Sequence, residues 1–228
     1  MKKAIQVSIV TLFLIFSSVL SAQEVGEQYY FSEDKPKVRP FRIGGKLGFP
    51  NLIGGNLEYV TPLLGDKLAV SVDYSTIKSD WFAPEEEEGY EESGDKIDYT
   101  YMEGGLNYYL FSPGKGLYVG ASYGTIRIDG EMMFYSENSD RTDPGTADID
   151  LTNSSFSVKL GAKLGGLFYF RPEVGYRFTP LPKDYETVVV FNDGYTETRQ
   201  TPPIDTESSP QNLLYKGLIA NIGLGFSF

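Results

Sequence analysis

The chain has 228 residues, and its 20 Lys and Arg residues against 31 Asp and Glu residues give a formal net charge of −11. It contains no His and no Cys, so it lacks the commonest general base and metal ligand and can form neither disulfides nor thiol nucleophiles. The acidic balance argues against nucleic-acid binding, because contacts to phosphates need clustered cations. We therefore expect neither a cofactor nor a nucleic-acid partner.

Residues 1–22 have the layout of a secretory signal peptide. Two lysines near the start precede a mostly apolar stretch at residues 5–20, and Ser21 and Ala22 then offer small residues to a signal peptidase. Cleavage after either Ser21 or Ala22 fits this pattern. The alternative, a retained anchor, is disfavoured because the apolar stretch is shorter than the span of about 20 residues that a membrane helix needs.

From residue 38 onward, apolar side chains alternate with small or charged ones. Successive side chains of a strand point to opposite faces, so each alternating segment has one apolar and one polar face. No sustained helical periodicity interrupts the pattern. The alternation predicts eight strands, at residues 38–49, 54–61, 67–82, 96–111, 117–136, 148–164, 167–180 and 213–228.

The links between these strands fall into two classes. Every second link is short and rich in turn residues, whereas the links between them, at 50–53, 83–95, 137–147 and 181–212, grow from 4 residues in the first to 32 in the last. Short turns at one end, long loops at the other and an even strand number are typical of a transmembrane β-barrel. We therefore predict an all-β fold, an eight-stranded antiparallel up-and-down barrel with long extracellular loops.

A soluble β-sandwich is the alternative, because it also uses short alternating strands. Its buried face would be large and apolar, whereas the polar face here carries glycines and both signs of charge, as a narrow barrel interior would. Aromatic residues also gather near both strand ends, as in the two belts of a membrane protein. Near the short turns these are Tyr59, Tyr108, Phe111, Phe168, Phe170, Phe226 and Phe228; toward the long loops they are Tyr74, Trp81, Tyr99, Tyr101, Tyr123, Tyr176 and Phe178.

The last long link contains a further alternating pair. Residues 188–191 and 195–199 flank Asn192-Asp193-Gly194, a tight-turn signature that predicts a β-hairpin. Residues 195–201 have no lipid-compatible face, so we expect this hairpin to stand above the membrane. The strand at 117–136 exceeds the 9–11 residues that a span needs, which predicts a sheet-like wall whose exposed edges can recruit a partner strand.

With this architecture, residues 38–228 resemble the small eight-stranded outer-membrane barrels of Gram-negative bacteria, of the outer-membrane protein A, X and W type. The sharpest shared feature is the C-terminal alternation of Leu224, Phe226 and Phe228, which resembles the assembly signal read by the barrel-insertion machinery. The resemblance implies an integral outer-membrane location. Residues 23–37 would then be a short periplasmic tail, without the peptidoglycan-binding domain that some members carry.

Strand parity assigns a set of charged side chains to the barrel interior. An eight-stranded barrel is only just wide enough for its own side chains, and unpaired charges there are costly. We therefore expect a mixed ion-pair network that plugs the lumen; the alternative is a gated conduction path or a ligand site. Its predicted members are Arg42, Lys46, Glu58, Asp73, Glu103, Lys159, Lys163, Arg171, Glu173 and Arg177.

The predicted external loops carry most of the negative charge. Residues 80–95 hold eight acids and no base, which indicates a solvated acidic tip. A weaker interpretation is a divalent-cation site that bridges to anionic lipopolysaccharide. Its candidate ligands are Glu85, Glu86, Glu87, Glu88, Glu91 and Glu92.

These features favour a non-catalytic outer-membrane protein with a sealed lumen, which acts as a structural or interaction protein through its acidic loops or as an accessory subunit of a larger outer-membrane complex. Enzymes built on the resembled barrels use an active-site His, which this chain lacks. The alternative is a small channel or carrier for apolar or small solutes, like the outer-membrane protein W type. Residues able to line its lateral pocket, or instead to pack against the loop hairpin, are Ile126, Ile128, Met132, Met133 and Phe134.

Overall fold

A computed structural model describes residues 38–81, 96–134, 145–201 and 212–228. The predicted signal peptide, the predicted tail at 23–37 and the glutamates of residues 85–92 lie outside the described residues. The strands are β1 (Phe41–Phe49), β2 (Leu52–Val60), β3 (Leu68–Ile77), β4 (Lys96–Tyr109), β5 (Gly116–Phe134), β6 (Gly145–Gly165), β7 (Phe168–Arg177), β8 (Tyr185–Phe191), β9 (Thr196–Thr201) and β10 (Leu218–Ser227). A 3₁₀ turn, η1 (Ser79–Trp81), and a short helix, α2 (Asn212–Tyr215), complete the elements.

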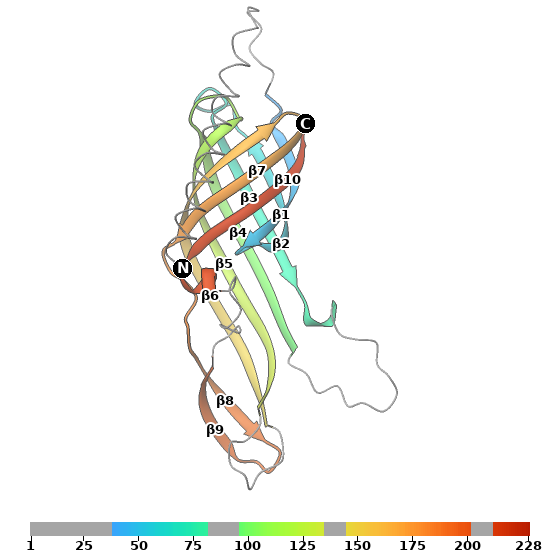
Figure 1. Ribbon diagram of the computed structural model, residues 1–228, viewed down its shortest axis with the longest axis vertical. Helices are drawn as coiled ribbons and strands as arrows, with labels where there is room; N and C mark the ends of the chain where they lie inside the picture. Colours follow the sequence, from blue (N-terminus) through green and yellow to red (C-terminus); the bar gives the residue numbers. More distant parts are fainter. Residues whose placement is uncertain (1–37, 82–95, 135–144, 202–211) are drawn as a thin grey trace, which may run out of the picture. The chain divides into compact units, whose positions relative to one another are not determined.

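Eight of these strands close into a barrel. Strands β1 to β7 pair antiparallel with their neighbours in sequence, and β10 pairs with both β7 and β1. The closing seam runs from the pair Arg42–Ser227 to the pair Phe49–Ala220. The predicted eight-stranded antiparallel up-and-down barrel is therefore confirmed, and Figure 1 shows its strands wrapped obliquely around a common axis.

The barrel is apolar outside and polar inside. On β10, Leu218, Leu224 and Phe226 are 40% to 50% exposed, whereas the alternate residues Asn221 and Ser227 are at most 3% exposed. A barrel dissolved in water would bury the apolar set instead. Each barrel strand also has a hydrogen-bonded neighbour on both sides, which is what a bilayer demands of a spanning sheet. The outer surface is therefore built to face hydrocarbon.

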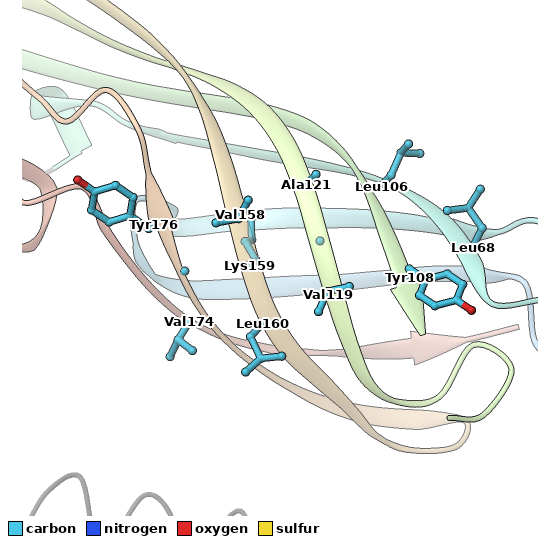
Figure 2. Close-up of a pocket in the computed structure, with 12 residues that line it drawn as sticks. Leu68, Leu106, Tyr108, Val119, Ala121, Val158, Lys159, Leu160, Val174 and Tyr176 are labelled. Atoms are coloured by element: carbon cyan, nitrogen blue, oxygen red, sulfur yellow. The ribbon is translucent and has the colours of Figure 1, made fainter. Parts of the chain in front are cut away.

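One part of this outer surface is hollowed into a shallow apolar groove of about 780 Å³. Figure 2 shows its labelled side chains standing on neighbouring strands of the barrel wall. The small side chain of Ala121 lies among larger ones, including Leu106 and Val158. These are the outward residues of the strand alternation, so the groove is part of the lipid-facing surface.

The two aromatic belts are present, with one correction. All seven residues assigned to the short-turn belt are exposed, as are Tyr74, Trp81, Tyr123, Tyr176 and Phe178 of the other belt. The prediction that Tyr99 and Tyr101 belong to that second belt is wrong, because they are 5% and 0% exposed. They share strand parity with Glu103, so their side chains point into the barrel.

Strands β4, β5 and β6 continue beyond the barrel as a wall, which Figure 1 shows beside the β8–β9 hairpin. Past the edge-on ring contact of Tyr123 with Phe156, at 4.9 Å between centroids, the outward side chains become charged. Here Arg127 donates a hydrogen bond to Asp129 at 2.9 Å, which raises the pKa of the exposed guanidinium. The change from aromatic to charged side chains marks where the membrane ends.

The predicted loop hairpin is confirmed as β8 and β9, joined by a turn in which Gly194 has φ +81°. It joins the wall through two residue pairs between the start of β6 and the end of β8, Gly145–Phe191 and Thr146–Val190. Phe134 packs against the buried Val189 and Phe191 of this hairpin. The hairpin is therefore anchored to the wall and is not part of the barrel.

All eight predicted strands differ from the structure at one or both ends, and β3 ends at Ile77 instead of residue 82 because residues 79–81 form η1. The last strand begins at Leu218, because residues 212–215 form α2, in which consecutive Leu213, Leu214 and Tyr215 break the alternation that a strand requires. Strand β2 begins at Leu52, inside the stretch predicted as a link. Among the described residues, no helix is long and apolar enough to cross a bilayer.

The orientation of β6 can be tested with one charge placed at two depths. Leu160 faces outward midway along the membrane part of β6, and Thr152 faces outward on the wall above it. Leu160→Arg should lower the free energy of unfolding by about 2–4 kcal/mol, because it buries a cation in lipid. Urea unfolding of the barrel refolded into lipid vesicles measures this, with Thr152→Arg as the control that should change little. Equal effects of the two substitutions would contradict the assigned membrane level.

Candidate functional site: the barrel interior

All ten charged residues that parity assigned to the lumen have buried side chains. Their relative exposures lie between 1% and 8%, and they come from six of the eight barrel strands. Four are carboxylates and six are cations. By strand they are Arg42 and Lys46 on β1, Glu58 on β2, Asp73 on β3, Glu103 on β4, Lys159 and Lys163 on β6, and Arg171, Glu173 and Arg177 on β7.

Arg171 joins the two sides of the interior. Its Nη1 lies 2.9 Å from Glu58 Oε2 of β2, and its Nε lies 3.0 Å from Glu173 Oε1 of its own strand. Glu58 also pairs with Arg42 of β1. The side chains of these four residues are at most 1% exposed, so each of these charges depends on its partners and not on solvent.

Lysines continue the network on the other side of Glu173. Lys46 Nζ lies 2.7 Å from Glu173 Oε2 and 2.5 Å from Asp73 Oδ2. Lys159 Nζ lies 3.6 Å from the same oxygen of Asp73 and pairs with Glu103. Together with the Arg171 cluster, this makes one continuous chain in which cations and carboxylates alternate. The chain runs Arg42, Glu58, Arg171, Glu173, Lys46, Asp73, Lys159, Glu103.

Buried tyrosines, which the sequence reasoning missed, complete the network. Tyr109 OH donates to Glu58 at 2.8 Å and accepts from Arg42 Nη1 at 2.6 Å. Tyr118 OH donates to Glu173 and accepts from Arg171 Nε at 2.6 Å, with the guanidinium carbon 4.8 Å from the ring centre. Extending the parity of β4 and β5 to their ends would have placed both rings inside.

Glycines make room for these rings. A Cβ on Gly161 would overlap the ring of Tyr118, and one on Gly44 or Gly225 would lie 2.6 Å from the hydroxyl of Tyr169. A narrow barrel can hold aromatic rings and long cations only where the facing wall has no side chain. The inward glycines and the inward tyrosines therefore form one packing arrangement.

Above the charges the interior becomes apolar. Ile126 and Ile128 of β5 are at most 1% exposed and pack with Tyr99 and Tyr101, and with Leu214 of α2. Their burial in this cluster favours packing inside the barrel over the alternative of lining a lateral pocket. Met132 packs partly buried against the same cluster, whereas Phe134 packs against the hairpin. For Phe134 the structure agrees with the alternative of packing against the hairpin.

Two segments outside the barrel strands contribute to this apolar layer. Leu181 and Leu214, from the segments that follow β7 and precede β10, are 3% and 2% exposed within it. Tyr99 OH donates a 2.6 Å hydrogen bond to the carbonyl of Pro50, in the β1–β2 turn. The described residues thus place an ionic layer in the interior and an apolar cluster above it. Among the described residues, no three His, Cys, Asp or Glu side chains are arranged to hold a metal ion.

The ionic layer predicts a strong dependence of stability on single members. Lys159→Met should lower the free energy of unfolding by about 3–5 kcal/mol, because Glu103 would keep a buried charge without its cation. The double variant Lys159→Met with Glu103→Gln should recover much of that loss, since both charges are gone. Urea unfolding of the refolded barrel measures the free energy of unfolding of the wild type, of Lys159→Met and of the double variant. Arg127→Met, at an exposed ion pair, is the control and should change stability little; a loss at Lys159 as small as this would contradict a sealed ionic layer.

No family model matches the sequence, and no curated protein matches it. Among solved structures, a major outer-membrane protein of Thermus thermophilus is similar at 15% identity and a TM-score of 0.41, covering 82% of this chain and 98% of the other. The N-terminal β-barrel domain of Pseudomonas aeruginosa OprF is similar at 16% identity and a TM-score of 0.39, covering 84% and 98%. Acinetobacter baumannii CarO is similar at 15% identity and a TM-score of 0.38, covering 83% and 98%.

Proposed function

We propose that this chain is a non-catalytic integral protein of the bacterial outer membrane, with a sealed lumen, that acts as a structural or interaction protein through its acidic external loops. The observation that carries the proposal is the filled interior. Eight charges in one alternating chain occupy the lower layer, and an apolar cluster with Ile126, Ile128 and Leu214 occupies the upper one. An interior packed in this way favours a scaffold over a conduit.

The surface supports the proposed location. The outward side chains of the barrel form an apolar band between two aromatic belts, as in proteins that span a bilayer with strands. The signal-peptide layout of residues 1–22 supports export, and the alternation ending in Phe226 and Phe228 supports recognition by the barrel-assembly machinery. Export and a lipid-facing barrel together favour the outer membrane.

The hairpin supports a role in protein interaction. On β8, Val189 and Phe191 face the wall and are at most 3% exposed, whereas Val188 and Val190 face away and are 54% and 49% exposed. The hairpin lies beyond the charged part of the wall, so lipid does not cover these valines. This exposed β-branched face favours contact with a protein partner, including the form of the proposal in which the chain is a subunit of a larger complex.

The acidic loop at residues 80–95 supports a second contact. Its glutamates would bind divalent cations that bridge to the phosphates of lipopolysaccharide, because carboxylate oxygens are the ligands these cations prefer. The absence of His from the sequence supports a non-catalytic role. The channel alternative loses support, because Ile126 and Ile128 are buried in the interior cluster.

A photo-crosslinking side chain placed at two outward positions tests the interaction role in living cells. At Val188, on the exposed face of the hairpin, we expect a discrete crosslinked protein of constant mass, because this face is free of lipid. At Val158, on the lipid-facing wall, we expect no crosslinked protein. The crosslinks are measured by gel shift and mass spectrometry of the purified outer membrane.

The same crosslinks at both positions, or none at Val188, would contradict the proposed partner contact. Exchange of the six loop glutamates for glutamine separates the two contacts. It should leave the Val188 crosslink unchanged and weaken retention of lipopolysaccharide in magnesium-containing buffer.

A further inference from the structure

Two of the six cations in the barrel interior have no carboxylate partner among the described residues. Arg42, Lys46, Lys159 and Arg171 all pair with carboxylates, and the four carboxylates are used in these pairs. Lys163 and Arg177 remain. Each lies near an aromatic ring, Lys163 at 5.3 Å from the centre of Tyr169 and Arg177 at 5.8 Å from that of Tyr101.

Of these two cations, Arg177 has the hydrogen-bond donors that lack an acceptor. It is 1% exposed, and its Nη2 donates to Asn153 Oδ1 at 3.0 Å, but its Nε and Nη1 are buried without a hydrogen-bond partner among the described residues. Lys163 carries no such buried, unpartnered nitrogen. A buried guanidinium that keeps its charge needs a counter-charge or other acceptors for its N–H groups. The described residues supply one side-chain amide, the backbone carbonyl of Asn153 at 3.4 Å from Nη2, and one ring.

The positions beside Arg177 carry further unpartnered donors. Arg177 on β7 is directly opposite Ser157 on β6, and Ser157 is directly opposite Ser122 on β5. Both serines are more than nine-tenths buried, and neither hydroxyl has a hydrogen-bond partner in the described part of the chain. Directly opposed strand residues have Cβ atoms about 5 Å apart, so these groups form a short row on the inner wall. The next position in the row, Gly105, adds no side chain.

We propose that this row binds a small inorganic anion of halide size, held by the Arg177 guanidinium and the hydroxyls of Ser157 and Ser122. Every polar group that is unpartnered in the row can donate a hydrogen bond, and none of them is a carboxylate. A halide accepts several such bonds at once and neutralises the charge of Arg177, one of the two cations without a carboxylate partner among the described residues. We name chloride as the halide, and the row lies beside Tyr101 of the apolar layer, 5.8 Å from the Arg177 guanidinium.

Bromide in place of chloride tests the site directly, because it scatters X-rays anomalously. Crystals of the refolded wild-type barrel in sodium bromide should show an anomalous peak within hydrogen-bonding distance of Arg177. In solution, bromide should raise the thermal unfolding midpoint in a saturable way when gluconate holds the ionic strength constant. At a bromide concentration of about 100 times its dissociation constant, the ratio of folded to unfolded protein should rise about 100-fold.

Three variants decide the outcome. Ser157→Ala removes a donor without touching the ion-pair chain and should weaken the bromide response, and Arg177→Met should abolish it. Lys163→Met, at the other unpaired cation, is the matched control and should leave it intact. A wild-type barrel without the anomalous peak, a peak without a saturable response in solution, or the same response in wild type and Ser157→Ala would each overturn the proposal. The serine variant keeps the test decisive if Arg177→Met fails to refold.

Discussion

Pairing of charge inside a cylinder too narrow for bulk water is the constraint on which this structure depends. A strand that faces lipid with one side must face the lumen with the other, and the lumen of eight strands has room only for side chains. Long cationic side chains and carboxylates can occupy that interior if each forms an ion pair with a side chain of opposite charge. The chain from Arg42 to Glu103 meets this condition by alternating the sign of charge across six strands.

The same constraint explains the distribution of the smallest and largest side chains. Tyr118 can lie under Arg171 and reach Glu173 because Gly161 presents no Cβ to its ring. Outside the barrel, aromatic rings pack on one another at the membrane borders, as Tyr123 does on Phe156. Inside the barrel, tyrosine hydroxyls therefore hydrogen-bond to charged side chains, whereas tyrosines on the outside belong to the aromatic belts. Strand parity decides between them.

Strand parity made much of this architecture predictable from the sequence. Alternation alone assigned Arg171 and Glu173 to the interior and Phe226 to lipid, and Asn192-Asp193-Gly194 located the hairpin. The misplacement of Tyr99 and Tyr101 came from judging them by their nearness to a strand end, when their parity with Glu103 pointed inward. A consistent use of parity would have avoided that error.

Other features could not be read from the sequence. Which cation meets which carboxylate depends on the stagger of the strands around the barrel, because Arg171 and Glu58 are far apart in the chain and lie on strands that do not pair. The apolar layer depends on Leu181 and Leu214, which belong to non-repeating segments beside β7 and β10. No periodic pattern marks such segments, so their place in the core follows only from the fold.

Single-channel conductance shows whether these two layers seal the barrel. The refolded protein without residues 1–22, which by gel should run as a compact barrel before heating, is inserted into a planar bilayer and recorded at single-channel resolution. A barrel sealed by both layers should leave the bilayer silent. Discrete openings that change when Glu103→Gln or Arg171→Met is introduced would contradict it, because the ionic layer would then act as a gate and not as a plug.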